Sequence, residues 1–553
     1  MDPNSNATTR TVSKGRNGSW LAAVMTVPLV LAGCGGGSAA PPATIGGTVA
    51  GLRTANSVVL QDNTGDATSV SVNGSFAFAT KVARGAAYAV TVLTQPTGQT
   101  CTVANGGGTV AAAAVSTVAV SCSNNTYGVG ATVSGLAANT SLVLQDNGGD
   151  SLTVSADGST GFNTPIASGS AYAVTVLTQA SGQTCTVTNG SGTVTAANVT
   201  NVSVTCVALH FAYVGNYSDG TVSAYAIDPN TGALTAVAGG PFAVSGTGTL
   251  SIALTPNGKF AYVASRYSSP TATPCGSTLS AFSVNANTGA LTPIAGSPFG
   301  SCPVSVTVDP TGKFAYATNL NTNTISAYTI DPTTGALTAV AGSPFATSTG
   351  PYFVAAAPNG KFLYVVNGIV AGGGYEISVY AIDAATGALT GIAGSPFSSG
   401  ANYLSVTIDP LGKFAYFTAF SDNTVSAYSI DATTGAPAAI AGSPFATGTG
   451  PAILTLDPSG HFAYVANHTS NSVSIYSVDA TTGALAPIAG SPVATGAGPF
   501  DVAIDPAGKF AYVTNYTDGT VSSYSRDGTT GALTSISGGT VPTGVRPFAI
   551  VIK

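Results

Sequence analysis

Short apolar runs alternate with polar turns along most of the chain, and after residue 207 they recur with a long period. A Phe-x-Tyr run begins at seven places 48 to 54 residues apart. Each copy holds four strand-like pieces, as in "VSVTVDP", "GKFAYAT", "TISAYTI" and "GALTAV" of the third copy. Four strands in a repeat of this length are typical of one β-propeller blade, so the pattern predicts a seven-bladed β-propeller over residues 207–553. The runs begin at Phe211, Phe260, Phe314, Phe362, Phe414, Phe462 and Phe510.

The connections between these pieces are as regular as the pieces themselves. The first and second are joined by Asp-Pro-x-Gly, where proline presets one turn dihedral and glycine supplies a positive φ. The third and fourth are joined by Asp-x-x-Thr-Gly, in which we expect the carboxylate to accept local backbone hydrogen bonds. Most aspartates of the chain therefore have a structural role. The second motif begins at Asp228, Asp331, Asp383, Asp431, Asp479 and Asp527, with Asn285 at the equivalent place in one copy.

The first blade lacks the strand that precedes the Phe-x-Tyr run in every other copy. The last residues of the chain, "PFAIVIK", align with "PFDVAIDP" at the start of the seventh copy. We therefore expect the C-terminal strand to pair with the first blade, which closes the ring and removes an exposed sheet edge.

Two shorter copies of another pattern precede the propeller. "AYAVTVLTQ" occurs at Ala87 and again at Ala171, and two further motifs share the same offset of 84 residues. Residues 44–122 and 127–206 are therefore tandem copies, each predicted to be a small β-sandwich of about seven strands. They resemble Ig-like modules of bacterial surface proteins. Because neither copy holds a cluster of acid, base or nucleophile, we expect them to act as a stalk.

The cysteines fit an exported protein. Two pairs share a spacing of 21 residues within the tandem copies, so each is expected to form a disulfide inside its own copy. A third pair lies in loops of neighbouring blades on one face of the propeller, and we expect a disulfide there as well. The pairs are Cys101 with Cys122, Cys185 with Cys206, and Cys275 with Cys302.

The N-terminus reads as a targeting segment. Basic residues precede a short apolar run, and Leu31-Ala32-Gly33-Cys34 resembles the lipobox of bacterial lipoproteins. That resemblance implies a signal peptide over residues 1–33, lipidation of Cys34 and a flexible tether over 34–43. The alternative is an ordinary signal peptide that leaves an unpaired thiol. Gly35 would fit sorting to the outer membrane or cell surface of a Gram-negative host, so we expect an exported lipoprotein of the cell envelope.

Composition narrows the possible partners. Only 7% of the residues are charged, and the 15 lysines and arginines form no basic run, so we expect no nucleic-acid partner. The sequence holds no EF-hand pattern, zinc-like cysteine spacing or histidine pair, and we predict neither a metal nor a cofactor.

The propeller repeats also carry a family resemblance. "YVTN" at residues 512–515, "FAYVANHTSNSVSIYSVD" from Phe462 and the recurring "TGALT…AGSPF" resemble the YVTN-repeat propellers. These belong with the lactonase-like seven-bladed group that includes 6-phosphogluconolactonase and the muconate-lactonizing cyclases. The resemblance covers the whole predicted propeller, and it is more specific for the fold than for an activity.

The resemblance implies catalysis by His, Arg and Glu at the mouth of the channel, often directly after a proline that begins an innermost strand. Here those places hold Val304, Tyr352, Ala452, Phe500 and Phe548, none of which carries a charge at neutral pH. Tyr352, Phe500 and Phe548 are therefore our candidates for ligand binding.

Strand parity places the loops that vary between blades on one face of the ring, and a site is expected there. The candidate catalytic residues on that face are Arg266, Glu376, His468 and Arg546. Arg266, in "YVASR", matches an arginine that follows the second strand in many family members. For His468 and Glu376 the alternative is a solvated loop residue without a role, which is the more frequent case for a lone loop histidine or carboxylate.

Two functions are compatible with these observations. The favoured one is a non-catalytic propeller, tethered to a membrane by its lipid and used to bind an envelope or extracellular protein or a carbohydrate. The alternative is a lactonase-type hydrolase that acts on an uncharged or weakly charged lactone at the channel mouth. The sequence names no ligand, and it does not say whether the channel is open.

Overall fold

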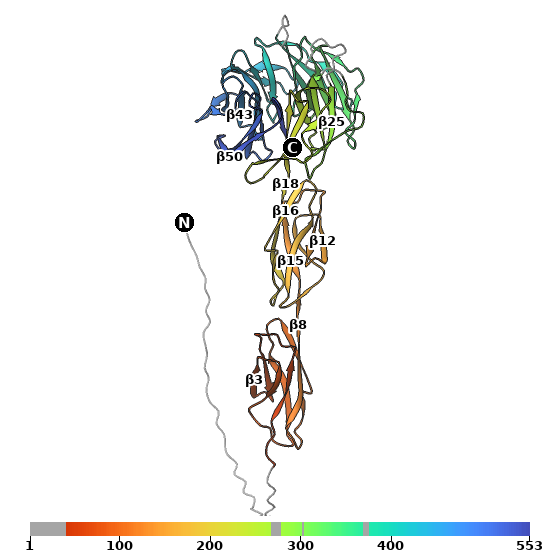
Figure 1. Ribbon diagram of the computed structural model, residues 1–553, viewed down its shortest axis with the longest axis vertical. Helices are drawn as coiled ribbons and strands as arrows, with labels where there is room; N and C mark the ends of the chain where they lie inside the picture. The colour runs from red at the N-terminus through yellow and green to blue at the C-terminus, as the bar shows by residue number, and fades with distance from the viewer. Residues whose placement is uncertain (1–39, 267–277, 301–302, 369–374) are drawn as a thin grey trace, which may run out of the picture. The chain divides into compact units, whose positions relative to one another are not determined.

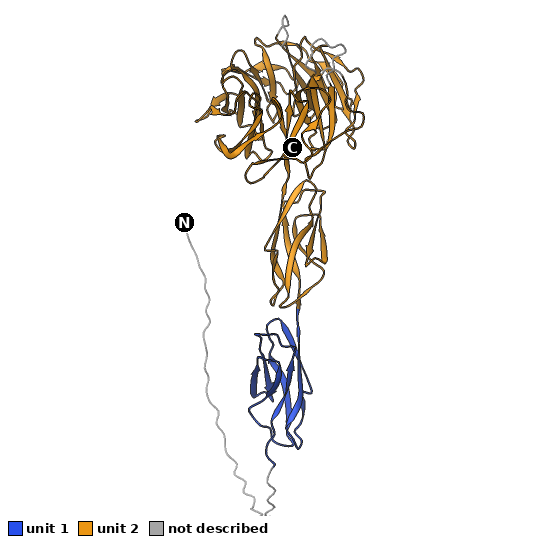
Figure 2. Cartoon of the chain, viewed as in Figure 1, with its two compact units in different colours: residues 1–125 blue, residues 126–553 orange. Residues whose placement is uncertain are grey.

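The computed structural model describes residues 40–266, 278–300, 303–368 and 375–553, and every regular element in these ranges is a β-strand (Figure 1). The chain forms two compact units, Met1–Asn125 and Thr126–Lys553 (Figure 2). No helix in the described ranges is long and apolar enough to span a membrane. The all-β prediction is confirmed.

The first unit contains two four-stranded sheets around one core. The sheet orders are β4-β1-β8-β6 and β3-β2-β5-β7, and β1 pairs with β8 in parallel. Alternate residues of both sheets, such as Ile45, Leu60 and Val120, point into the core and are almost fully buried. The strands are β1 (Ile45–Ala50), β2 (Val58–Asp62), β3 (Asp66–Val70), β4 (Gly74–Ala77), β5 (Ala87–Thr94), β6 (Gln99–Ala104), β7 (Gly107–Thr109) and β8 (Val115–Asn124).

Residues 126–208 of the second unit repeat this arrangement. Their sheets run β13-β10-β18-β16 and β12-β11-β15-β17, with a short β9–β14 pair beside them. Each copy therefore has eight strands in its two main sheets, where the sequence indicated about seven. The strands are β9 (Thr126–Tyr127), β10 (Val129–Ser134), β11 (Leu142–Asp146), β12 (Asp150–Val154), β13 (Gly158–Gly161), β14 (Ile166–Ala167), β15 (Ala171–Thr178), β16 (Gln183–Thr188), β17 (Ser191–Thr193) and β18 (Val199–Ala208).

Both disulfides expected in the tandem copies are present. Cys101 on β6 lies opposite Cys122 on β8, and Cys185 on β16 lies opposite Cys206 on β18. Each bond therefore joins neighbouring strands of one sheet and does not cross between sheets. Cys34, Cys275 and Cys302, which were predicted to be lipidated or to form the third disulfide, lie outside the described residues.

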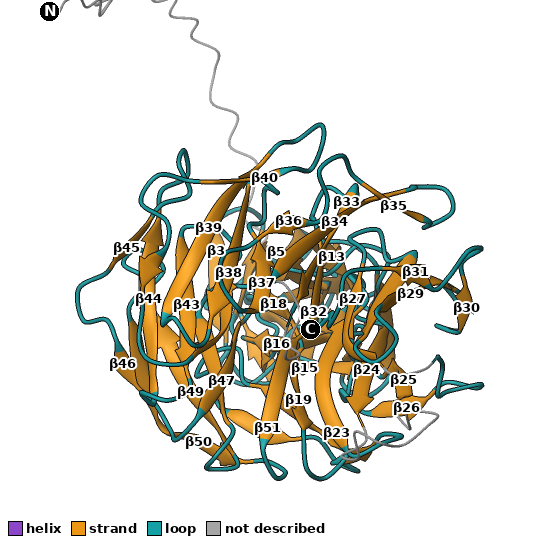
Figure 3. Cartoon of the chain, turned by 90° about the horizontal axis from the view of Figure 1, so that it is seen from above, coloured by secondary structure: helices purple, strands orange, loops and turns teal. Residues whose placement is uncertain are grey.

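The remainder of the second unit forms seven sheets of four or five strands, the blades of the predicted propeller (Figure 3). In blades two to seven the strand order follows the chain from the innermost strand outward. The innermost strands are β23 (Gly248–Leu254), β27 (Pro303–Val308), β32 (Phe353–Ala356), β37 (Tyr403–Ile408), β42 (Pro451–Leu456) and β47 (Pro499–Ile504), and β51 (Pro547–Ile552) takes this place in blade one.

The second strand of each blade carries the Phe-x-Tyr motif and is almost completely buried. The second strands are β19 (His210–Asn216), β24 (Phe260–Arg266), β28 (Phe314–Asn319), β33 (Phe362–Asn367), β38 (Phe414–Ala419), β43 (Phe462–Asn467) and β48 (Phe510–Asn515). The third strands are β20 (Thr221–Ile227), β25 (Thr278–Val284), β29 (Thr324–Ile330), β34 (Glu376–Ile382), β39 (Thr424–Ile430), β44 (Ser472–Val478) and β49 (Thr520–Arg526).

Short outer strands complete the blades. The fourth strands are β21 (Leu234–Ala236), β26 (Leu291–Pro293), β30 (Leu337–Ala339), β35 (Leu389–Gly391), β40 (Pro437–Ala439), β45 (Leu485–Pro487) and β50 (Leu533–Pro542). In five blades a further short strand pairs with the third: β22 (Phe242–Ala243), β31 (Phe345–Ala346), β36 (Phe397–Ser398), β41 (Phe445–Ala446) and β46 (Val493–Ala494).

The two repeated motifs fasten neighbouring blades to each other. The tyrosine hydroxyl of each Phe-x-Tyr strand donates to the carbonyl of the Thr-Gly glycine in the next blade, as from Tyr213 to Gly289 at 2.9 Å. The same bond runs from Tyr512 of blade seven to Gly232 of blade one at 3.0 Å. At Gly232 the φ is 71° and a Cβ would lie 2.4 Å from the Phe510 ring, so the turn requires glycine.

The Asp-x-x-Thr-Gly carboxylates accept local backbone hydrogen bonds, as predicted. Asp331 is typical, since its Oδ1 accepts from the backbone N–H of Thr333 and of Thr334. The Thr334 backbone N–H, the Thr334 hydroxyl and the Thr333 backbone N–H lower the pKa of this carboxyl. These aspartates therefore shape the turns.

The C-terminal strand β51 pairs with β19 of the first blade in antiparallel register. Val551 lies opposite Tyr213 and Ile550 lies opposite Val214. Beyond the ladder, the Lys553 backbone N–H donates to the Phe211 carbonyl at 2.9 Å. The innermost strand missing from the first repeat is therefore supplied from the other end of the chain.

Candidate ligand site at the channel mouth

The innermost strands of all seven blades line a central cavity of about 480 Å³. Towards the start of these strands the cavity narrows to a constriction of about 10 Å³, lined mainly by apolar side chains. Two of these side chains, Phe500 and Phe548, contact each other, with ring centroids 3.6 Å apart. The residues that follow the strand-opening prolines therefore narrow the channel at its mouth, and none brings a charge to it.

A bowl of about 280 Å³ lies at the beginnings of the innermost strands and the adjoining loops. Tyr352, Phe500 and Phe548, the three predicted ligand-binding residues, all line it. Phe420, from the loop after β38, forms another part of the wall, and Asn402 and Ser421 add polar groups. The structure thus brings together the three residues that the sequence selected.

The aromatic surface continues beyond the bowl. The His468 ring lies 6.2 Å from Phe420 and 6.0 Å from Phe500, and Tyr516 lies 5.8 Å from His468 and 6.3 Å from Phe548. His468, Phe500 and Tyr516 are each partly exposed. Half-buried rings with free faces and edges are suited to binding a ligand that has apolar faces of its own.

Two polar atoms near these rings are buried and lack a hydrogen-bond partner. They are the Oδ1 of Asn402, which belongs to the bowl, and the Nδ1 of His468. A buried polar atom without a partner costs about 1–3 kcal/mol, so such atoms in a folded protein need an explanation. A ligand with hydroxyl or amide groups would supply the missing bonds.

Two of the remaining candidates, Arg546 and Arg266, lie near aromatic residues of the mouth. Arg546 stacks over the Tyr516 ring at 5.5 Å. Burial is the main cause that raises the pKa of Tyr352 to about 12, and the nearby charge of Arg266 opposes it. Tyr352 therefore stays a neutral hydroxyl.

Glu376 begins β34, opposite Asn367 and Ser398 in the ladder. No ion pair joins its carboxylate to Arg266 or Arg546, because the one ion pair among the described residues lies elsewhere. The described ranges also contain no group of three or more His, Cys, Asp or Glu that could hold a metal.

Two aspartates of the mouth loops prove to be structural. Asp518 accepts from the Ala497 backbone N–H at 2.6 Å, and Asp219 accepts from the Val545 backbone N–H at 2.5 Å. Each holds a loop that leads into an innermost strand, which is the role of a turn residue.

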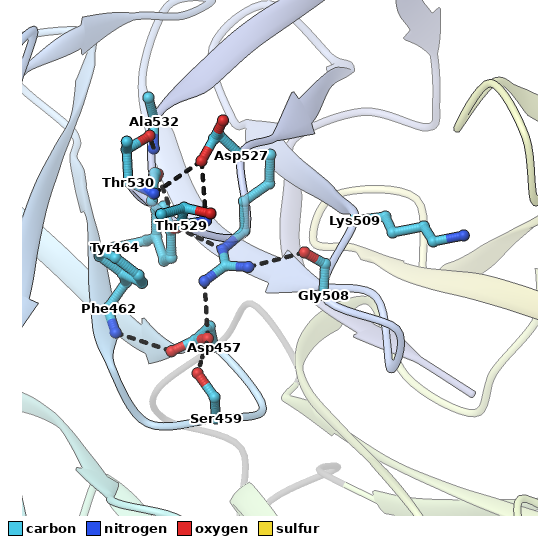
Figure 4. Close-up of polar contacts among 12 residues, drawn as sticks. Asp457, Ser459, Phe462, Tyr464, Gly508, Lys509, Asp527, Thr529, Thr530 and Ala532 are labelled. Atoms are coloured by element: carbon cyan, nitrogen blue, oxygen red, sulfur yellow. Dashed lines mark hydrogen bonds and ion pairs between the residues drawn. The ribbon is translucent and has the colours of Figure 1, made fainter. Parts of the chain in front are cut away.

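Arg526 was not among the residues predicted from the sequence, because it lies on the face opposite the variable loops. It ends β49 on the face of the Asp-Pro-x-Gly turns and is buried, and its guanidinium binds residues of blades six and seven. Figure 4 labels three of these partners, Asp457, Tyr464 and Gly508. Nη2 pairs with Asp457 at 2.7 Å, Nε donates to the Tyr464 hydroxyl, and Nη1 donates to the Gly508 carbonyl. Its signal in the sequence is simple: Ile or Val ends the third strand in the other six blades.

Asp501 was also overlooked. It lies in β47, lines the central cavity and is buried, and its Oδ2 accepts from the Ile550 backbone N–H of β51 at 3.0 Å. Ser251 and Ser305 occupy the same place in other blades and bond the next innermost strand in the same way. The carboxyl therefore links the last blade to the C-terminal strand where a serine hydroxyl serves elsewhere.

The stability of the propeller should depend on the protonation of Asp501. Burial raises its pKa from 3.8 to about 7, against the opposing effect of the N–H groups of Ile550 and Val502. Below about pH 4 the group is protonated in the folded and unfolded states, and between about pH 4 and 7 only the folded state keeps the proton. Its contribution to stability therefore falls as pH rises through this window.

We expect thermal unfolding between pH 4.5 and 8.5 to show a wild-type melting temperature that falls relative to Asp501→Asn as pH rises. The exposed Asp518→Asn is the control and should keep the wild-type slope. Parallel curves for wild type and Asp501→Asn would contradict the assignment.

The comparisons with known proteins agree with this architecture. A family model described as "Lactonase, 7-bladed beta-propeller" matches residues 177–348, 341–442 and 435–546, which together make up more than half of the chain. No curated protein matches the chain.

Several solved structures are similar. Candidate 6-phosphogluconolactonases from Bacteroides uniformis and Bacteroides fragilis are 20% and 22% identical, with TM-scores of 0.54 and 0.53. The periplasmic gluconolactonase of Pseudomonas aeruginosa is 17% identical, with a TM-score of 0.51. Each match covers 62% of this chain and 98–99% of the other. At these identities the likeness shows the fold alone.

Proposed function

The chain belongs to the lactonase family of seven-bladed β-propellers, and from this premise we propose that it is a non-catalytic binding module that takes its ligand in the aromatic bowl. The supporting observation is the lining of the bowl, which includes the rings of Tyr352, Phe420, Phe500 and Phe548 and contains no Asp, Glu, His, Lys or Arg. A lactonase needs a base to activate water and donors to hold the oxyanion. Aromatic rings provide binding area but neither of these functions.

The same proposal places the propeller at the cell envelope. The lipobox-like segment ending in Cys34 supports a lipid anchor, and the two disulfide-bonded copies support an oxidising compartment outside the cytoplasm. The tandem copies then serve as a stalk between the anchor and the ring.

A second function, hydrolysis of a lactone, rests on one specific observation. The His468 Nδ1 is buried without a partner close to the mouth, and Tyr516 contacts both His468 and Arg546. Together these two residues would offer a base and a cation. The fold neighbours named as gluconolactonases make this the alternative to test.

The test uses the full chain, expressed with its N-terminal segment. A panel of γ- and δ-lactones, including sugar lactones, should show no turnover above that of a heat-denatured sample. Turnover that is lost in His468→Ala and kept in the exposed control Leu411→Ser would overturn the proposal in favour of the lactonase.

The lipid anchor is tested separately by cell fractionation. The wild-type protein should fractionate with membranes and Cys34→Ser with the soluble material, and a soluble wild-type protein would contradict the anchor.

A further inference from the structure

A second cavity, of about 480 Å³, opens where the last blade meets the first. One wall comes from the loop after β48, which includes Tyr516 and Asp518. The other wall comes from the segment that leads into β51 and ends with Val545 and Arg546. We call this the seam cavity.

The bowl and the seam cavity share one aromatic surface. Phe548 lines the bowl, Tyr516 lines the seam cavity, and their ring centroids lie 6.3 Å apart at 72°. Tyr217 contacts both rings, at 6.1 and 6.3 Å. Ring contacts therefore lead from Phe548 in the bowl to Tyr516 in the seam cavity, and Arg546 lies over Tyr516.

The seam cavity differs from the bowl in its charged groups. The Arg546 guanidinium lies over Tyr516 and has no carboxylate within ion-pair distance among the described residues. Asp518 uses one oxygen for the Ala497 N–H. One cation and one carboxylate present both donors and acceptors, and their formal charges cancel.

The backbone at Arg546 is held in an uncommon conformation. Its φ is 59°, in the left-handed region that favours glycine and asparagine. Its carbonyl accepts from the Tyr217 N–H at 2.9 Å, and the neighbouring Val545 N–H is held by Asp219. A strained residue fixed from both sides is consistent with a side chain placed for binding.

We propose that an uncharged oligosaccharide lies across the two cavities, with one sugar ring in the aromatic bowl and a later ring in the seam cavity beside Arg546 and Asp518. This inference rests on the proposed binding function and names its ligand class. Sugar rings have apolar C–H faces that stack on aromatic side chains. Their hydroxyls both donate and accept, which matches Arg546 and Asp518 of the seam cavity and the Asn402 side chain of the bowl.

The charge balance argues against other ligands. A phosphorylated or polyanionic ligand requires several cations, whereas Arg546 is offset by Asp518 within the same cavity. An apolar ligand in the bowl would leave Asn402 Oδ1 unpaired. A neutral polyhydroxylated chain satisfies both the rings and the polar atoms.

The test is calorimetric titration of the full chain with the neutral tetrasaccharides of cellulose, starch and chitin, and with the corresponding monosaccharides. A tetragalacturonate serves as the anionic probe. We expect at least one neutral tetrasaccharide to bind about tenfold or more tightly than its monosaccharide, and the anionic probe to bind more weakly. Absence of binding by every neutral saccharide, or preference for the anionic probe, would overturn the proposal.

Three variants separate the two cavities. Phe420→Ala, in the bowl, should weaken the monosaccharide and the tetrasaccharide alike. Arg546→Asn keeps a residue that tolerates the left-handed backbone, and it should weaken the tetrasaccharide about tenfold while the monosaccharide changes less than about twofold. Leu411→Ser, exposed on the opposite face, should change neither. Equal losses for both saccharides in Arg546→Asn would refute the seam cavity as a subsite.

The two proposals fail in distinguishable ways. Lactone turnover that depends on His468 removes the non-catalytic function and the oligosaccharide proposal with it. If there is no lactone turnover, and the protein binds to envelope extracts but to none of the neutral saccharides, only the oligosaccharide proposal is contradicted.

Discussion

Deletion of residues 547–553 should abolish the cooperative unfolding transition of the propeller. The segment supplies the innermost strand of blade one and buries Phe548 and Ile550, worth about 1.5–3 kcal/mol each. Its loss would also free the Asp501 carboxyl from the Ile550 N–H and expose the edge of β19. A domain stabilised by about 5–15 kcal/mol is not expected to remain folded after such a loss.

The measurement is thermal and urea unfolding followed by near-ultraviolet circular dichroism. Two full-length variants test the same role of the strand if the truncated protein is degraded during expression. Ile550→Asn should lower the melting temperature strongly at full length, whereas Val545→Ser, exposed just before the strand, should leave it within about 2 °C of wild type. A synthetic peptide of residues 546–553 should restore part of the transition. A truncated propeller that melts as the wild type does would refute the proposed role of the strand.

The sequence was most informative where the same pattern occurs seven times. Each copy of Phe-x-Tyr places a tyrosine hydroxyl against the glycine carbonyl of the next blade, so the motif encodes a contact between blades as well as a strand. A contact that is made in every blade requires the same residues at a regular spacing, and this spacing is visible in the sequence alone. The strand pairing of residues 547–552 was predictable for the same reason.

The candidate site could be predicted only in part, because its geometry depends on differences between blades. Position after a proline identified Tyr352, Phe500 and Phe548, and these three do line the bowl. Phe420 comes from a variable loop after the second strand of another blade, where no repeated pattern indicates its direction. Its partnership with His468 arises only when the blades are assembled.

Asp501 and Arg526 show a different limit. Asp501 stands where some other blades have serine, and Arg526 stands where the other six blades have Ile or Val. An alignment of the seven repeats would therefore have shown both residues as exceptions. Such an alignment would not identify the groups to which these two side chains bond. Asp501 bonds the C-terminal strand and Arg526 bonds a turn of the preceding blade, so both partners lie far away in the sequence.

Replacing Arg526 by isoleucine, the residue at this position in several other blades, should destabilise the propeller by about 3 kcal/mol. Removing one partner of a buried ion pair leaves the other charge uncompensated, which typically costs about 3–5 kcal/mol. Stacking of the guanidinium at 5.2 Å from the Phe462 ring would be lost as well. The matched control is Arg266→Ile on the opposite face, which should change stability by about 0.5 kcal/mol or less.

The loss of stability in Arg526→Ile depends on whether backbone N–H groups of the Asp457 turn can replace the guanidinium as hydrogen-bond donors to the Asp457 carboxylate. In the equivalent turns Asp309 and Asp505 each accept three backbone N–H groups, whereas Asp457 accepts only the Phe462 N–H and relies on Ser459 and Arg526 for the rest. If the turn cannot rearrange, Asp457→Asn should recover much of the loss in Arg526→Ile, because it removes the unpaired charge. A double-mutant cycle in urea measures this coupling. A loss below about 1 kcal/mol in Arg526→Ile would show that the turn adopts the three-bond form of the other blades and that the ion pair is dispensable.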